Sequence, residues 1–114
     1  MARTGESIVK QAVKDYLTMV GCITAGKAAL ATQAHTGWYF MPVGGYMSGV
    51  SGIPDFIGHI RGHFFSVETK VEKKNPTPLQ QHQINAINLS GGKAFVVRGV
   101  NDLEEFKEWV KKCL

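Results

Sequence analysis

Two acidic residues and a lysine near the middle of the chain have the types and spacing of a metal-dependent hydrolytic site. Asp55 begins one β-rich run, and Glu68 and Lys70 lie near the end of the next. Arg61-Gly62 separates the two runs and is typical of a two-residue hairpin turn. Pairing across such a turn places Asp55 directly opposite Glu68.

A divalent cation would remove the electrostatic cost of this arrangement. Carboxylates directly opposite across two strands have Cβ atoms about 4.5–5.5 Å apart and destabilise the sheet unless a positive charge lies between them. Oxygen ligands suit Mg²⁺ or Mn²⁺, which polarises a phosphate oxygen and acidifies a bound water. Lys70 lies on the same face as Glu68 and could orient that water or neutralise developing charge. The alternative is that Asp55 merely starts a strand and that Glu68 and Lys70 are solvated.

Glu6 and Gln80 are further polar candidates, and each has two interpretations. Glu6 is either another metal ligand, directly or through water, or a first-turn acid favoured by the helix dipole. It lies on the apolar stripe of the first helix, with Val9, Val13 and Leu17. Gln80 either belongs to the site or completes a capping box with Thr77. We interpret His59 and His63 as surface or packing residues, because the hairpin register keeps them apart.

The charge balance favours a polyanionic partner such as nucleic acid. Lys and Arg number 13 against nine Asp and Glu, which gives a net charge of +4. The candidates for contact with DNA phosphates are Arg61, Lys73, Lys74, Lys93 and Arg98. Any of these residues can instead be a solvated surface charge.

Hydrophobic periodicity and turn residues predict the elements that must position these side chains. Thr4 is the expected cap of the first helix, and Asn101 or Asp102 that of the last. A flexible glycine-rich loop is expected around Gly44, Gly45, Gly49 and Gly52. The expected elements are a helix over 7–20, a strand near 38–42, hairpin strands over 55–60 and 63–71, a helix over 78–90, a strand over 93–98 and a helix over 103–113.

Length and composition predict one soluble domain over residues 1–114. The sequence contains no apolar run of the roughly 18 residues that a membrane-spanning helix needs. Glu6 lies where a signal peptide would have its apolar core, so we expect a cytoplasmic protein that is not secreted. Cys22 and Cys113 lack the spacing of a zinc site or a disulfide framework.

The order and spacing of these motifs resemble a known nuclease family. Gly52-Ile53-Pro54-Asp55 followed by Glu68-Thr69-Lys70 is the PD-(D/E)-x-K pattern, and its surroundings resemble the virus-type replication-repair nuclease (VRR-NUC) domain. The supporting pieces span nearly the whole chain: Glu6-Ser7, the hairpin with Gly62, Gln80, and Gly91-Gly92 before Ala94-Phe95-Val96-Val97.

This resemblance implies an α/β fold with a restriction-endonuclease-like core, in which helices flank a mixed central β-sheet in the order α-β-β-β-α-β-α. It also implies Mg²⁺- or Mn²⁺-dependent cleavage of DNA. Asp55 and Glu68 would be metal ligands, Thr69 would lend its backbone carbonyl, and Lys70 would be the catalytic lysine. Glu6 and Gln80 would be accessory polar residues. The segment 25–47 departs from the family pattern, because it is Ala-rich with few basic residues.

The function we expect is that of a structure-selective DNA endonuclease without an organic cofactor. Short members of the family resemble Holliday-junction resolvases, act as homodimers on branched DNA, and occur in phages and bacteria. One alternative is a nuclease-fold module that binds DNA without catalysis, although facing carboxylates would repel phosphate. Another is a nuclease that nicks DNA or cuts single strands.

Overall fold

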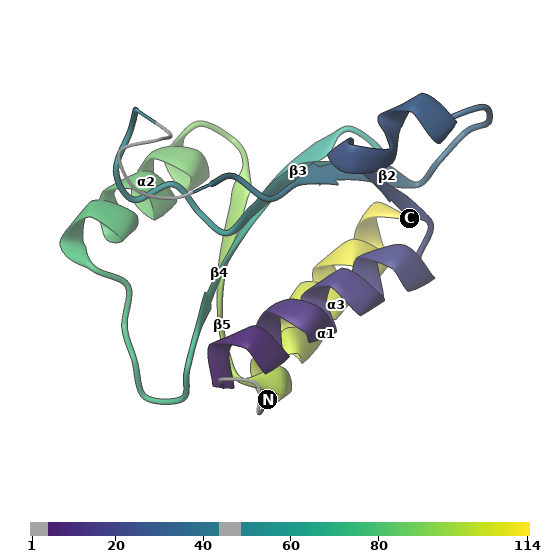
Figure 1. The fold of residues 1–114 in the computed structure, drawn as a ribbon. Helices are drawn as coiled ribbons and strands as arrows, with labels where there is room; N and C mark the ends of the chain where they lie inside the picture. Colours follow the sequence, from purple (N-terminus) through teal and green to yellow (C-terminus); the bar gives the residue numbers. More distant parts are fainter. Residues whose placement is uncertain (1–4, 44–48) are drawn as a thin grey trace.

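A five-stranded mixed sheet forms the centre of the protein (Figure 1). The computed structural model describes residues 5–43 and 49–114. The strand order is β1-β2-β3-β4-β5, with the outer pairs β1–β2 and β4–β5 parallel and the inner pairs antiparallel. This arrangement confirms the predicted α/β class and its mixed central sheet. The strands are β1 (Cys22–Thr24), β2 (Gly37–Phe40), β3 (Phe56–Ile60), β4 (His63–Lys70) and β5 (Lys93–Arg98).

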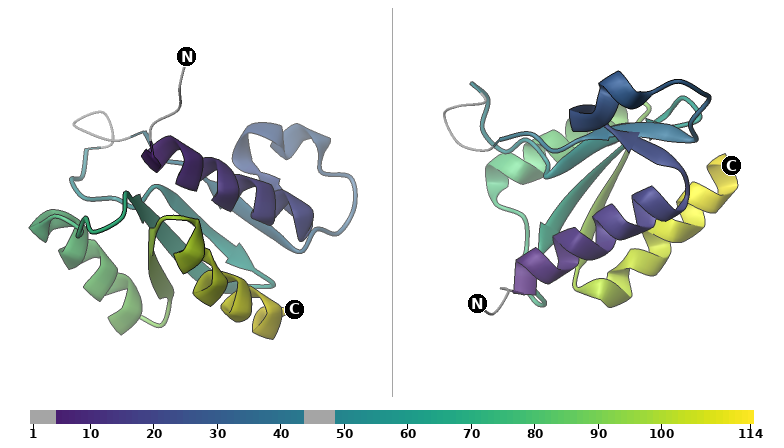
Figure 2. Two further views of the ribbon diagram at one scale, coloured as in Figure 1. Left: turned by 90° about the horizontal axis from the view of Figure 1, so that it is seen from below. Right: turned by 45° about the vertical axis from the view of Figure 1, so that its right-hand side comes forward.

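Helices cover both faces of the sheet. Helices α1 and α3 lie together on one face, and α2 lies on the other (Figures 1 and 2). Among the described residues, no helix combines the length and the apolar character needed to cross a membrane. The helices are α1 (Gly5–Met19), α2 (Pro78–Leu89) and α3 (Leu103–Cys113), with short 3₁₀ helices η1 (Ala25–Leu30) and η3 (Val100–Asp102).

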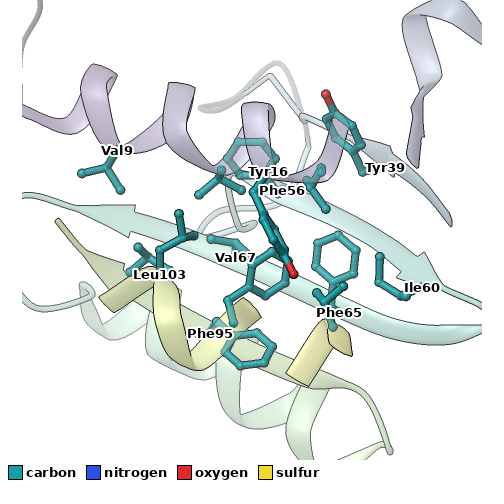
Figure 3. Close-up of a cluster of buried hydrophobic side chains, with 14 residues drawn as sticks. Val9, Tyr16, Tyr39, Phe56, Ile60, Phe65, Val67, Phe95 and Leu103 are labelled. Carbon is teal, nitrogen blue, oxygen red and sulfur yellow. The ribbon is translucent and has the colours of Figure 1, made fainter. Parts of the chain in front are cut away.

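The hydrophobic core lies between the sheet and the helices α1 and α3 (Figure 3). Phe56, Phe65 and Phe106 are fully buried there, and the rings of Phe65 and Phe106 lie 5.2 Å apart between centroids. Burial of each such ring stabilises the fold by about 1.5–3 kcal/mol. Because side chains alternate along a strand, the neighbours of Phe65 in β4 point to the opposite face.

The β3–β4 hairpin has the predicted register. Ile60 pairs with His63, and the ladder continues to Phe56 and Val67. The two turn residues between the strands both have positive φ, 46° for Arg61 and 87° for Gly62. A turn of this kind follows the right-handed twist of the flanking strands, which explains why it sets the register.

The first third of the chain departs from prediction, because β1 was not expected and adds one strand to the predicted order. This strand has three residues, and its pairing with Gly37–Tyr39 stabilises it rather than any local pattern. The Ala-rich segment that follows forms η1, where Lys27 leaves helical geometry. Gly44 and Gly45 of the expected glycine-rich loop, and the expected cap Thr4, lie outside the described residues.

The side-chain cap predicted for the last helix does not form. Asp102 does precede α3, but its side chain makes no capping hydrogen bond. Its Oδ2 instead accepts a hydrogen bond from the backbone N–H of Arg98, 2.8 Å away. The carboxylate therefore ties the end of β5 to η3.

Candidate functional site

Asp55 is attached to the far end of the hairpin by two hydrogen bonds. The residue precedes β3, just outside the paired ladder, so the predicted direct pairing with Glu68 does not extend to it. Its Oδ2 accepts from the backbone N–H of Thr69 at 2.8 Å and from the Thr69 hydroxyl at 2.7 Å. The Asp55 carboxylate is thus held against β4 beside Glu68. The sequence pattern gave no signal for this role of the Thr69 side chain.

The segment before Asp55 packs closely against the beginning of α2. Gly52 has a φ of +81°, and a Cβ atom there would lie 2.5 Å from the backbone carbonyl of Leu79. Only glycine permits both this conformation and this approach. The contact brings the Asp55 segment beside the first turn of α2, which carries Gln80.

Glu68 is a buried carboxylate with one oxygen unsatisfied. Glu68 as a whole residue is 3% exposed to solvent. Oε1 accepts a hydrogen bond from Gln80 Nε2 at 3.2 Å and lies 4.0 Å from Lys70 Nζ. Oε2 is buried and has no hydrogen-bond partner among the described residues. Such an oxygen is costly to bury unless a proton or a cation accompanies it.

The electrostatic environment of Glu68 also favours a bound proton or cation. Burial, followed by the negative charge of Asp55, raises the pKa of Glu68 to about 8, and the positive charge of Lys70 offsets only part of this rise. In the absence of a further cation, the site therefore holds a proton at neutral pH.

A divalent cation fits these residues. Asp55 and Glu68 supply hard oxygen donors, and the unsatisfied Oε2 is a ready acceptor. Within residues 5–43 and 49–114, no group of three or more His, Cys, Asp or Glu side chains is arranged to hold a metal ion. Side chains would thus provide two carboxylates, and backbone or water oxygens would complete the coordination, as Mg²⁺ commonly requires.

Gln80 both caps α2 and contacts Glu68, and its accessory role in the site stays a prediction. Its Oε1 accepts from the backbone N–H of Thr77 at 2.9 Å, and the Thr77 hydroxyl accepts from the backbone N–H of Gln80 at 3.2 Å. These two bonds form the capping box of α2. The amide orientation that completes the cap also directs Nε2 toward Glu68. The cap therefore positions a hydrogen-bond donor at the site.

Lys10 connects Glu6 with Asp55 and was not singled out from the sequence. Its Nζ lies 3.7 Å from Glu6 Oε1 and 3.7 Å from Asp55 Oδ1. Glu6 is partly exposed in the first turn of α1 and reaches the site through this lysine. The spacing of Glu6 and Lys10 is that of a helical ion pair, but only the packing of α1 reveals Asp55 beside it. A role for Glu6 as a metal ligand stays a prediction.

The predicted phosphate-binding residues have unequal surroundings. Arg98 is engaged within the fold, because Nε donates to the backbone carbonyl of Lys74 at 2.6 Å and Nη2 donates to Asn75 Oδ1 at 3.0 Å. His59 and His63 are exposed, as expected. The remaining basic candidates are also exposed: Arg61, Lys73, Lys74 and Lys93.

Comparison with solved structures gives one informative match. A structure described as a "VRR_NUC domain" superposes with a TM-score of 0.69 and 23% sequence identity, over 93% of this chain and 97% of that chain. The chain has the VRR_NUC fold. No protein-family model matches the sequence. No curated protein matches it either.

The VRR_NUC fold agrees with the restriction-endonuclease-like core that the family resemblance implied. The match extends over nearly the full length of both chains. The resemblance first drawn from Asp55, Glu68 and Lys70 therefore holds for the architecture that carries these residues.

Proposed function

We propose that this chain is a metal-dependent DNA endonuclease that hydrolyses phosphodiester bonds. The observation that carries the proposal is the buried Glu68 carboxylate, whose Oε2 lacks a partner among the described residues although Asp55 lies beside it. Lys70 Nζ, 4.0 Å from Glu68, adds the lysine of the PD-(D/E)-x-K pattern. The VRR_NUC fold supports the same reaction class.

In this proposal, Asp55 and Glu68 would hold Mg²⁺ or Mn²⁺, with the Thr69 backbone carbonyl as a further oxygen ligand. The ion would supply Lewis-acid activation of the phosphate and a more acidic water. The bonds from Thr69 fix the Asp55 carboxylate, and Gln80 fixes that of Glu68. Carboxylates that are already held in this way lose little orientational freedom when they bind the ion.

Lys70 stabilises the reacting phosphate. An ammonium group beside the carboxylates neutralises negative charge that develops as water oxygen bonds to phosphorus and the ester P–O bond breaks. The attacking water gives up a proton and the leaving oxygen gains one, so that a hydroxyl end and a phosphate end result and one water is consumed. Only 17% of the Lys70 side chain is exposed, so solvent screens its charge less than that of a surface lysine.

For the substrate, we place branched DNA such as a Holliday junction first, cut by a homodimer with one site for each of two strands. The net charge of +4 favours DNA, and a single copy of 114 residues offers little surface for a four-way structure. A DNA-binding module without catalysis is the second candidate. The adjacent acidic residues Asp55 and Glu68 argue against it, because a module that only binds DNA has no need of two carboxyl groups and a lysine gathered in one site.

Cleavage of a labelled four-way junction, a linear duplex and a single strand of the same sequence tests the proposal. We expect cutting in Mg²⁺ or Mn²⁺ and none in chelator, with loss of cutting in Asp55→Ala. Lys70→Ala should lose about 10²–10³-fold in rate yet still bind DNA. Binding without cutting in every metal would favour the binding module, and full activity of Asp55→Ala would remove this site from the mechanism.

A further inference from the structure

A groove between α1 and η1 lies beside the proposed active site and is lined by groups that can bind phosphate. η1 faces the C-terminal half of α1 across this groove, which has a volume of about 390 Å³ (Figure 2). Lys, Gln, Thr and Tyr side chains are among those that contact the phosphates of DNA. Six such residues line the groove: Gln11, Lys14, Thr18, Thr24, Lys27 and Tyr39. We call it the α1–η1 groove.

The α1–η1 groove begins close to Asp55 on two elements. In α1, Lys10 Nζ lies 3.7 Å from Asp55 Oδ1, and Lys14 of the groove follows one turn later. Four residues of helix advance about 6 Å along the axis, so the two lysines are neighbours. In the sheet, Phe40 of the groove pairs with Ile57, two residues after Asp55. A DNA strand with a phosphate at the proposed site can therefore place a nearby phosphate in the groove.

The protein does not neutralise the positive charge in the α1–η1 groove. Lys14 belongs to α1 and Lys27 to η1, and neither forms a salt bridge with any described residue. Among the described residues of the lining, Asp15 is the one acid, and its Oδ1 accepts a hydrogen bond from Gln11 Nε2 at 2.8 Å. The lining therefore has a net positive charge, which favours an anionic ligand.

η1 contributes to this groove rather than to the core. None of its residues is buried, and Lys27 is its one charged residue. The backbone leaves helical geometry at Lys27, where φ is −114°. What the segment adds to the molecule is thus a lysine placed across the groove from Lys14.

Tyr39 gives a second, independent indication of a ligand. The residue is 4% exposed, and its ring packs in the core against Phe56 at 6.0 Å between centroids. Its hydroxyl points away from the other core side chains (Figure 3) and makes no hydrogen bond with the described part of the chain. The hydroxyl of a buried tyrosine usually has a hydrogen-bond partner. A ligand in the α1–η1 groove, which Tyr39 lines, would supply that partner.

We propose that the α1–η1 groove binds a backbone phosphate of the DNA strand near the phosphate that is cut, with Lys14, Lys27 and Tyr39 as its donors. This inference rests on the proposed nuclease function and adds residues that hold its substrate. Contacts of this kind fix the register of the strand and do not read its base sequence. A phosphate suits the groove better than an apolar partner, which would leave two cations and a hydroxyl without partners.

DNA binding in chelator, where cutting does not occur, tests the groove separately from catalysis. A lysine that neutralises one phosphate adds about 0.7–0.9 to the slope of log affinity against log salt concentration. Lys14→Met and Lys27→Met should each reduce the slope by about this amount and weaken binding about five- to tenfold near 0.1 M salt. Tyr39→Phe keeps the buried ring, so it should weaken binding a few-fold without changing the slope or the thermal stability. Anisotropy of labelled DNA over a range of KCl concentrations measures these effects.

The matched control is Lys112→Met, which removes an exposed lysine near the end of α3, outside the α1–η1 groove. It should bind DNA like the wild type. Equal losses in all three lysine variants would indicate an effect of net charge alone and would overturn the proposal, as would wild-type binding by both groove variants. Stabilisation by inorganic phosphate that both groove variants lose, with DNA binding unchanged, would assign the groove to a free anion and would also overturn it.

Neutral methylphosphonate linkages, placed one at a time on either side of the cut, test where the bound phosphate lies. In Mg²⁺ or Mn²⁺ and at limiting DNA, one nearby linkage should slow cleavage by the wild type about five- to tenfold. Lys14→Met should be insensitive to that linkage and respond to the others as the wild type does. Equal sensitivity of the two proteins at every position would contradict the placement. Absence of cutting in every metal, with the losses of binding intact, would refute the catalytic proposal alone.

Discussion

The two faces of β4 differ in what they contribute to the protein. On one face Phe65, Val67 and Thr69 are fully buried beneath α1 and α3. On the other face Phe64 remains exposed, while Ser66 Oγ and Glu68 Oε2 are buried without hydrogen-bond partners among the described residues. One strand thus supplies both a well-packed core and a set of unsatisfied groups.

This difference separates stability from function. The packed face lowers the free energy of the folded state through burial of apolar surface. The unsatisfied face raises it, because buried polar atoms without partners and exposed rings are both unfavourable. Groups that cost stability persist where a ligand uses them. The polar end of this face fits a cation.

Substitution of the two adjacent phenylalanines should show the largest contrast. Phe65→Ala removes a fully buried ring and should lower the free energy of unfolding by about 3–5 kcal/mol. Phe64→Ala should lower it by less than about 1 kcal/mol, because the ring is 43% exposed. Urea denaturation of both variants measures the two values. Similar losses would mean that the faces are not energetically distinct.

In the metal-free protein, Glu68→Gln should raise stability at pH 8, by less than Phe65→Ala lowers it. Its pKa is raised from 4.5 to about 8 in the folded state, chiefly by burial. The folded state therefore holds the proton more tightly, and the contribution of Glu68 to stability falls as pH rises between these values. Glu68→Gln should lack this fall and be the more stable protein at pH 8.

Thermal unfolding from pH 4 to 9 in chelator measures this difference, with Ser66→Ala as the control. Ser66 lies on the same face and also buries an unpaired oxygen, but it does not titrate. Its variant should keep the wild-type pH dependence. If the unfolding temperature of Glu68→Gln changes with pH as that of the wild type does, burial does not raise the pKa of the Glu68 carboxylate.

Substitution of Lys10 should have the smallest effect, and this effect should be on metal affinity. Its ammonium lies 3.7 Å from Asp55 Oδ1 and competes with any cation bound there. Lys10→Met should therefore tighten Mn²⁺ binding a few-fold, since a partly exposed charge interacts weakly. Lys14→Met, one turn further along α1, serves as the control and should leave Mn²⁺ affinity unchanged. Weaker Mn²⁺ binding by Lys10→Met would mean that the lysine supports the carboxylate instead of competing with the ion.

The parts of the molecule that the sequence predicted are those set by local rules. A two-residue turn fixed the hairpin register, and alternation then placed Glu68 and Lys70 on one face. The capping box of α2 was likewise readable from Thr77 and Gln80. The three-residue strand β1 was missed, because its stability comes from pairing with β2.

The contacts that the sequence did not predict depend on how distant elements pack. Lys10 reaches Asp55 only because α1 crosses the end of the hairpin, and no spacing rule relates positions 10 and 55. The bonds from Thr69 to Asp55 require the bend just before β3. The dual role of Gln80 also needed the position of Glu68 relative to α2. Each is a tertiary contact between segments that carry no joint sequence signal.

The most direct test is a calorimetric titration of Mn²⁺ into the protein at pH 7, in two buffers with different ionisation enthalpies. We expect binding that releases close to one proton, because the Glu68 pKa of about 8 leaves that group protonated beforehand. Asp55→Asn and Glu68→Gln should abolish binding, and Ser66→Ala should retain it. Mn²⁺ binding that is absent in the wild type, or unaffected by both carboxylate substitutions, would contradict the assignment of this site.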